Sequence, residues 1–428
     1  MAQDTISVRG MFLNMKSIGF NQLNCLCEKI DNSISANSRN IIFRIDSSES
    51  NIIISDDGDG MNMEQLQICG TVHRRTESNE NKQGRFGAGG NIADIDLTDL
   101  GKVHYISKPK DGSDVVEMML NYNIQRNDEY ILNPHCASRR TEEEIWTQFA
   151  VDKNNCGTVQ RLYSTPENVK KLTNSINNRE ILTSYMFKLG CIYCKQLQKG
   201  LKIDFIIEDQ QFRIYPIDRF KKNEMVDSNK QEIIISVWLN ESDKSYWAYY
   251  TDEKGTTYYR DYSNPRGRGK TTKGTPNPAL KLIGNINVNS TYHEKWFECL
   301  KQDFEKMKIV NNSPNDKTLP LIGGIVIERN DKEIAQFPSG HAGMSAGLIP
   351  YYQNSHHNVS FKATQEMDDL FGVLVNKSNL EEKNINKEVF RMVKYICDTF
   401  GTKMKKLHEY PFVAPTPVAP TPVAPTPV

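Results

Sequence analysis

Three short stretches decide how this chain is read: CEKIDNSISA at residues 27–36, DDGDGM at 56–61 and GRFGAGG at 84–90. A helical Glu-x-x-x-Asn, a strand-ending Asp followed by glycines, and a glycine-rich turn supply different parts of a nucleotide-binding site. Each stretch is common when it stands alone. Their order and spacing together predict a pocket for ATP.

The first stretch lies in a predicted amphipathic helix, because apolar residues recur at helical spacing. Glu28 and Asn32 are four residues apart and are therefore neighbours on the face away from the apolar stripe. A solvated polar face is the common alternative for an isolated pair of this kind. A carboxylate that orients water and an amide that ligates Mg²⁺ must project from one rigid element, because phosphoryl transfer depends on positioning. The apolar stripe consists of Leu23, Leu26, Cys27, Ile30 and Ile34.

The second stretch follows two β-branched segments, 40–45 and 51–54, whose polar connection predicts a hairpin. The second strand brings Asp56 to its end, where a carboxylate can accept a hydrogen bond from the adenine amine. Gly58 and Gly60 allow a tight turn and a close approach to the base.

A calcium loop is an alternative reading of the acidic residues at 56, 57 and 59. The twelfth position counted from Asp56 is Gln67, where an EF-hand loop requires Glu. This departure disfavours calcium binding at this place.

The third stretch follows polar residues 71–83, whose lack of periodicity predicts a mobile loop. The glycines at 84, 87, 89 and 90 leave backbone N–H groups free to cradle phosphates at the start of a helix. Further along, residues 156–162 alternate like a strand.

In this order the stretches resemble the GHKL ATPases, which include the ATPase component of DNA gyrase, the heat-shock-ninety chaperones, the MutL proteins and the MORC proteins. The resemblance implies an α+β chain: a GHKL (Bergerat-type) α/β sandwich ATPase domain, followed by an α/β transducer-like domain with a ribosomal-protein-like fold. It implies ATP and Mg²⁺ as ligands, Glu28 as the catalytic base and Asn32 as the Mg²⁺ ligand. The nucleotide contacts that it implies, besides Asn32, are Asp56, Gly58, Gly60, Met61, Gly84, Phe86, Gly87, Ala88, Gly89 and Thr158, whose hydroxyl would support Asp56.

The chain departs from the family pattern at three positions. Asp57 replaces the usual Asn, Asn91 stands where Lys is frequent, and Ser35 replaces a family Asp. These departures keep open the alternative of a scaffold that binds ATP without turnover.

The second half resembles the transducer domain, with the closest likeness to MORC proteins. A hairpin at 323–334 and a variable loop precede Asn376-Lys377, and a last helix is expected near 384–400. Because a transducer lysine reaches the γ-phosphate in this family, the resemblance assigns that role to Lys377, with Lys362 as the substitute. An exposed lysine at a strand end is the alternative for either one.

We expect three parts: a GHKL ATP-binding domain at 1–172, a transducer-like domain at 173–402, and a basic stub with a proline-rich tail at 403–428. The second part should contain a helix around 176–198 and strands at 203–207 and 232–238. The tail repeats Val-Ala-Pro-Thr-Pro, which favours a polyproline-II spacer.

Composition bounds the remaining possibilities. The chain has 428 residues, 38% hydrophobic and 25% charged, with a net charge of zero, so general attraction to nucleic acid is not indicated. The basic loop 265–273 is the one local candidate, although such runs are commonly solvated, and it lacks the first glycine of a Walker loop. The nine cysteines lack framework spacing, and the sequence shows no leader and no apolar run of membrane length. These features predict a soluble, non-secreted intracellular protein of the cytoplasm or nucleus. We interpret the pair Cys191 and Cys194 as core residues rather than zinc ligands.

Family behaviour suggests slow ATP hydrolysis that closes a lid and clamps two subunits into a homodimer. The leading hypothesis is a MORC-like ATPase that traps or compacts DNA. A heat-shock-ninety-like chaperone ATPase and the ATP-binding scaffold without turnover are the alternatives.

Overall fold

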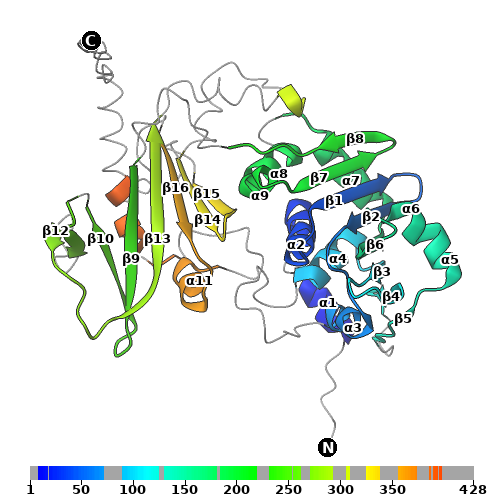
Figure 1. Ribbon diagram of the computed structural model, residues 1–428, viewed down its shortest axis with the longest axis horizontal. Coiled ribbons are helices and arrows are strands. Elements are labelled where there is room, and N and C mark those ends of the chain that lie inside the picture. The colour runs from blue at the N-terminus through cyan, green and yellow to red at the C-terminus, as the bar shows by residue number, and fades with distance from the viewer. Residues whose placement is uncertain are drawn as a thin grey trace, which may run out of the picture.

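The computed structural model describes two units, each built on an eight-stranded mixed sheet (Figure 1). The first unit lies on the right in Figure 1 and the second on the left. The described residues are 8–17, 19–71, 89–124, 130–180, 184–218, 231–252, 254–261, 270–292, 305–308, 324–337, 355–373, 385–386, 389–393 and 395–397.

The first sheet has the order β5-β4-β3-β6-β2-β1-β7-β8. Its strands are β1 (Asn40–Asp46), β2 (Asn51–Asp56), β3 (Lys102–Lys108), β4 (Val116–Asn121), β5 (His135–Cys136), β6 (Gly157–Tyr163), β7 (Lys202–Ile207) and β8 (Gln210–Arg213). The β1–β2 hairpin and the β6 strand that the sequence predicts are confirmed. Only the β1–β7 pair is parallel among the described ladders of this sheet.

Helices cover one face of this sheet, and the main hydrophobic core lies between the two layers. A smaller cluster on the opposite face places Ile145 and Trp146 against Ile53, Ile106 and Val159. Because β2 is covered on both faces, its residues are buried without alternation. The helices are α1 (Val8–Ser17), α2 (Gln22–Ser35), α3 (Met63–Gly70), α4 (Gly89–Thr98), α5 (Arg139–Thr141), a π-helical turn η1 (Glu142–Trp146), α6 (Thr147–Phe149), α7 (Pro166–Asn177), α8 (Tyr185–Ile192) and α9 (Cys194–Gln198).

The single helix expected around 176–198 is wrong, because this region contains the end of α7 and two further helices. The Asn178 side chain accepts a hydrogen bond from the backbone N–H of Glu180, which competes with helix continuation. Ser184 then caps a new helix by accepting from the N–H of Phe187. Cys191 in α8 is buried, and Cys194 in α9 is half-buried.

The second sheet has the order β12-β11-β10-β9-β13-β16-β14-β15, with one parallel pair, β14–β16, among its described ladders. Helix α11 (Gln365–Phe371) and the helical residues 389–393 and 395–397 pack their apolar side chains on this sheet. The hairpin and the last helix predicted for this half are thereby confirmed. The strands are β9 (Gln231–Asn240), β10 (Ser245–Thr251), β11 (Thr257–Asp261), β12 (Lys270–Lys273), β13 (Lys281–Tyr292), β14 (Gly324–Arg329), β15 (Lys332–Phe337) and β16 (Ser355–Phe361).

The two sheets divide between β8 and β9, later in the chain than the boundary expected at residue 172/173. The reason is that β7 returns to pair with β1, so residues up to Arg213 extend the first sheet. The chain is thus an α+β protein with two sheet-based units. Among the described helices we find none with the length and apolar character needed to cross a membrane.

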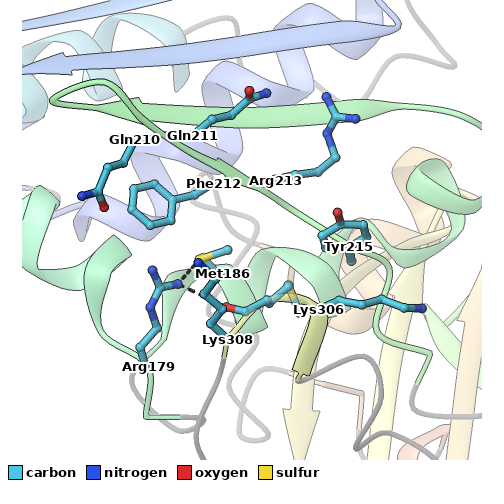
Figure 2. Close-up of a pocket in the computed structure, with 10 residues that line it drawn as sticks. Arg179, Met186, Gln210, Gln211, Phe212, Arg213, Tyr215, Lys306 and Lys308 are labelled. Atoms are coloured by element: carbon cyan, nitrogen blue, oxygen red, sulfur yellow. Dashed lines mark hydrogen bonds between the residues drawn. The ribbon is translucent and has the colours of Figure 1, made fainter.

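A cavity of about 660 Å³ lies beside β8, between that strand and residues 305–308 (Figure 2). The guanidinium of Arg179 stacks 4.8 Å from the ring centre of Phe212 and donates to the carbonyl of Met307 at 3.2 Å. Arg213 is neutralised by a bidentate ion pair with Asp204. None of the predicted nucleotide-site residues lines this cavity.

Candidate nucleotide site

Helix α2 is buried on nearly every side, which is unusual for a helix that carries three charged residues in its centre. The side chain of Asn21 caps its start by accepting from the N–H of Asn24. Its buried residues are Gln22, Asn24, Cys25, Leu26, Cys27, Glu28, Lys29, Ile30, Asp31 and Ser33. The predicted helix is therefore confirmed, but Glu28, only 6% exposed, does not lie on a solvated face.

The start of α4 contacts the polar face of α2. A Cβ atom on Gly89 would lie 2.7 Å from Cδ of Glu28, and one on Gly90 would lie 3.1 Å from Nδ2 of Asn32. The glycine-rich stretch and the Glu-x-x-x-Asn pair, some 60 residues apart in sequence, are thus brought together. A side chain at residue 89 would therefore displace the carboxylate of Glu28 from its observed position.

Asn32 is exposed one helical turn after Glu28, so its carboxamide faces an open region. Carboxamide and carboxylate oxygens, together with water and phosphate oxygens, are the ligands that Mg²⁺ prefers. The donor set at this place therefore fits Mg²⁺.

Asp56 lies at the end of β2 and is 6% exposed. Its carboxylate accepts from the Ser33 hydroxyl at 2.9 Å and from the N–H of Gly58 at 3.0 Å. Burial raises the pKa of Asp56 to about 6, against the opposing effect of these hydrogen bonds. A buried carboxylate at a strand end, held by fixed donors, is suited to accept a hydrogen bond from the amine of a planar base.

Thr158 pairs with Asp56 across the β2–β6 ladder, and a backbone hydrogen bond from Thr158 supports the carboxylate. The Thr158 hydroxyl lies 3.0 Å from the hydroxyl oxygen of Ser107. Among the contacts that the structure describes, the support for Asp56 thus comes from the backbone of Thr158 and not from its hydroxyl. Ser107 also accepts from the N–H of Met61 at 2.8 Å, and so fixes the loop after β2.

The two glycines of the second stretch have structural reasons. Gly60 has φ of +67°, and a Cβ on it would overlap the backbone of Lys108. A Cβ on Gly58 would lie 2.8 Å from the carbonyl oxygen of Ala36. Both positions therefore keep the loop after Asp56 closely packed against its neighbours.

Asp57 turns away from Asp56 and binds the start of β1. Its carboxylate accepts from the Ser38 hydroxyl and from the N–H groups of Arg39 and Asn40, each at 2.8 Å. Burial opposes ionisation, but these hydrogen bonds hold the pKa of Asp57 below its ordinary value. The departure from Asn at this position thus serves a local structural contact.

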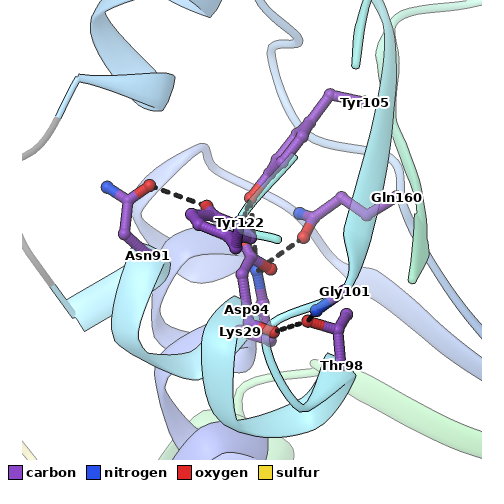
Figure 3. A network of polar contacts seen from close by, with 8 residues as sticks. All are labelled: Lys29, Asn91, Asp94, Thr98, Gly101, Tyr105, Tyr122 and Gln160. Carbon is purple, nitrogen blue, oxygen red and sulfur yellow. Dashed lines mark hydrogen bonds and ion pairs between the residues drawn. The ribbon is translucent and has the colours of Figure 1, made fainter. Parts of the chain in front are cut away.

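A buried ion pair joins α2 to α4 behind the site (Figure 3). The ammonium of Lys29 contacts Asp94 and donates to Gln160 at 2.9 Å, and Asp94 also accepts from the Tyr105 hydroxyl at 2.6 Å. Asn91, the second departure from the family pattern, is buried and accepts from the Tyr122 hydroxyl at 2.9 Å. This network fixes the direction in which α4 leaves the glycine-rich stretch.

Residues 21–158 match the family model described as histidine kinase-, DNA gyrase B-, and HSP90-like ATPase. The first unit therefore contains a GHKL-type ATPase domain. The match supports ATP as the ligand of this domain. No curated protein matches the chain significantly.

Five of the predicted site residues lie outside the residues that the structure describes. These positions are Gly84, Phe86, Gly87, Ala88 and Lys377. The substitute, Lys362, is described and exposed, directly after β16.

Sequence reasoning missed three groups that border the site of the GHKL domain. Ser33 was unassigned although it follows Asn32 directly, and its hydroxyl reaches Asp56. Lys29 and Asp31 lie between Glu28 and Asn32 in sequence, and both have buried partners. The available signal was a pair of oppositely charged residues inside the predicted helix, next to the apolar Ile30.

Proposed function

We propose that the chain binds ATP with Mg²⁺ between α2, the end of β2 and the start of α4, and hydrolyses it slowly. The contact between Gly89 and Glu28 carries this proposal. It places a carboxylate against the backbone of a helix start, where phosphates are commonly held. The family match supports the same ligand.

Each residue would have one task in this reaction. Asp56 accepts from the adenine amine, the glycine backbone at 89 and 90 holds phosphate oxygens, and Glu28 orients the attacking water and takes its proton. Mg²⁺, held by Asn32, would neutralise phosphate charge. Buried neighbours fix Glu28 and Asp56, so both are held in place before the nucleotide arrives.

The wider part of the proposal concerns what turnover drives. ATP binding closes the segment before Gly89 over the nucleotide and clamps two subunits into a dimer, and Lys377 contacts the γ-phosphate. The clamp acts on DNA inside the cell, in the manner of MORC proteins. The support is the family match of residues 21–158, together with the second α/β unit that follows the GHKL domain in the chain.

The test is ATP turnover with and without duplex DNA, with Glu28→Gln as the background control. Stimulation by DNA supports the MORC-like proposal. A turnover rate that does not change when DNA is added favours the chaperone-type alternative. ATP binding without turnover above that of the control favours the scaffold.

The dimer is tested by small-angle scattering with a non-hydrolysable ATP analogue and with ADP. We expect a compact dimer with the analogue only, and loss of compaction in Lys377→Ala. A mutant that still compacts would contradict the assignment of Lys377.

A further inference from the structure

A hairpin of the second unit reaches into the first unit and ends next to the catalytic turn of α2. Lys332, at the start of β15, is only 6% exposed, and its ammonium lies 2.6 Å from Oδ2 of Asp31. Asp31 is 2% exposed and directly precedes Asn32. This ion pair joins residues that are 301 positions apart in the chain.

The other oxygen of Asp31 is also engaged. It lies 2.9 Å from the Tyr193 hydroxyl, which is equally close to the carbonyl oxygen of Cys27. The ammonium of Lys332 lies 5.2 Å from the centre of the Tyr193 ring, within cation–π range. Burial would lower the pKa of Lys332, but the Asp31 carboxylate holds that pKa above its ordinary value, so the ammonium remains charged.

This contact acts on one flank of Glu28. Successive residues of an α-helix are rotated by about 100° around the helix axis. Lys29 and Asp31 therefore project on opposite sides of Glu28 when the helix is viewed along its axis. The Lys29 side is held within the GHKL domain by Asp94. The Asp31 side is held by Lys332 of the second unit and by the Tyr193 hydroxyl of the first unit.

The hairpin that presents Lys332 is firmly placed. Asn330 and Asp331 form its turn with φ of +50° and +66°, and the guanidinium of Arg329 makes a buried bidentate pair with Asp368. Lys195 of α9 contacts Glu328 at 2.5 Å and Asp331 at 3.3 Å, which binds the hairpin to the first unit from the side. A displacement of the second unit would therefore be transmitted to Asp31.

We propose that Lys332 is a positioning residue, which holds the turn of α2 that carries Glu28 and Asn32 and so links turnover to the placement of the second unit. The inference rests on the proposed ATPase function, and it concerns a lysine different from the one assigned to the γ-phosphate. Lys332 acts through Asp31, and its ammonium is occupied by that carboxylate.

The first test compares Lys332→Met with the double variant Asp31→Asn/Lys332→Met. The single change leaves a buried carboxylate unpaired and destabilises the protein, whereas the double variant removes both charges and restores stability. We expect kcat to fall at least about tenfold in both variants, with the ATP dissociation constant within about threefold of wild type. Double-variant turnover equal to that of wild type would mean that the pair is merely structural.

Lys199→Met is the matched control, because Lys199 pairs with Asp331 of the same hairpin at 3.0 Å through exposed side chains, and it does not contact α2 in any interaction that the structure describes. Its kcat should remain within about twofold of wild type. An equal loss in Lys199→Met and the double variant would contradict a specific role for Lys332.

A second measurement does not require turnover, so a failure of the ATPase proposal can be told apart from a failure of this one. Hydrogen exchange of residues 22–35 in the nucleotide-free full chain should accelerate about tenfold in the double variant and not in Lys199→Met, while residues 166–177 serve as the internal reference. Unchanged exchange of residues 22–35 in the double variant would overturn the inference whether or not the wild type hydrolyses ATP.

Discussion

Gly89 at the start of α4 leaves the space that the carboxylate of Glu28 occupies. A Cβ atom at this glycine would lie 2.7 Å from Cδ of Glu28, and closer still to its Oε2 oxygen. The neighbouring Gly90 is less constrained, with its nearest group, Nδ2 of Asn32, at 3.1 Å. The carboxylate of Glu28 can take this position because the residue that faces it has no side chain.

Gly89→Ala should therefore displace Glu28 and lower kcat by about 100-fold, since small misplacements of catalytic groups have effects of that size. Gly90→Ala is the matched control and should lose no more than about tenfold, because the exposed Asn32 can move. Steady-state ATP hydrolysis measures both. Equal kcat values for the two variants would contradict the close contact with Glu28.

Asp56→Asn should weaken ATP binding, because the amide would present a donor to the adenine amine. A hydrogen bond to a charged acceptor contributes about 1.5–3 kcal/mol, so we expect a loss of about one to two orders of magnitude in affinity. Titration calorimetry with ATP measures this loss. Unchanged affinity would place the adenine pocket elsewhere.

The raised pKa of Asp56 also predicts how the stability of the nucleotide-free protein depends on pH. Folding favours the protonated acid, so the stabilisation is complete below the ordinary pKa of 3.8 and is lost as the pH rises through about 6. The ionised group then costs about 3 kcal/mol at 1.36 kcal/mol per pKa unit. In Asp56→Asn the amide oxygen can still accept from Gly58, so the stability of the variant relative to wild type should rise between the ordinary pKa of 3.8 and about pH 6, and stay constant above that. Urea unfolding at several pH values tests this, and a pH-independent difference would contradict the shifted pKa.

The Lys29–Asp94 pair is predicted to be essential for folding. Lys29→Met leaves a buried carboxylate without its charged partner and should destabilise the protein by about 3–5 kcal/mol. The exposed pair of Lys110 and Asp59 provides the control, and Lys110→Met should leave the unfolding midpoint unchanged. Denaturant unfolding followed by circular dichroism compares the variants. A midpoint for Lys29→Met equal to that of Lys110→Met would be incompatible with the buried network.

Local patterns in the sequence were sufficient for the elements that carry the site. The spacing of Leu26 and Ile30 predicted α2, and β-branched runs predicted the hairpin that ends at Asp56. These signals are strong because burial of one helix face, or of a whole strand, leaves a regular pattern of apolar residues in the sequence. The division into α7, α8 and α9 was missed, although Thr165, Pro166 and Ser184 are start signals for helices.

The contacts that complete the site depend on tertiary structure and were not predictable from spacing. Asp57 was identified only as a departure from the family's Asn, and spacing did not predict that it turns to Asn40 at the start of β1. The partner of Asp31 lies in another unit of the chain, and a charged residue on a helix does not reveal a partner 301 residues away. Sequence patterns report which faces are buried, but not which buried charges meet.

The central claim is that Glu28 performs chemistry in an ATP site, and Glu28→Gln tests it most directly because the amide fills the same space beside Gly89. We expect kcat to fall by at least about 100-fold, as for loss of a general base, while ATP affinity stays within about tenfold, or about 1.4 kcal/mol. Turnover and calorimetric binding are measured on the same preparation. Turnover equal to wild type, or a parallel loss of binding and turnover, would contradict the role of Glu28.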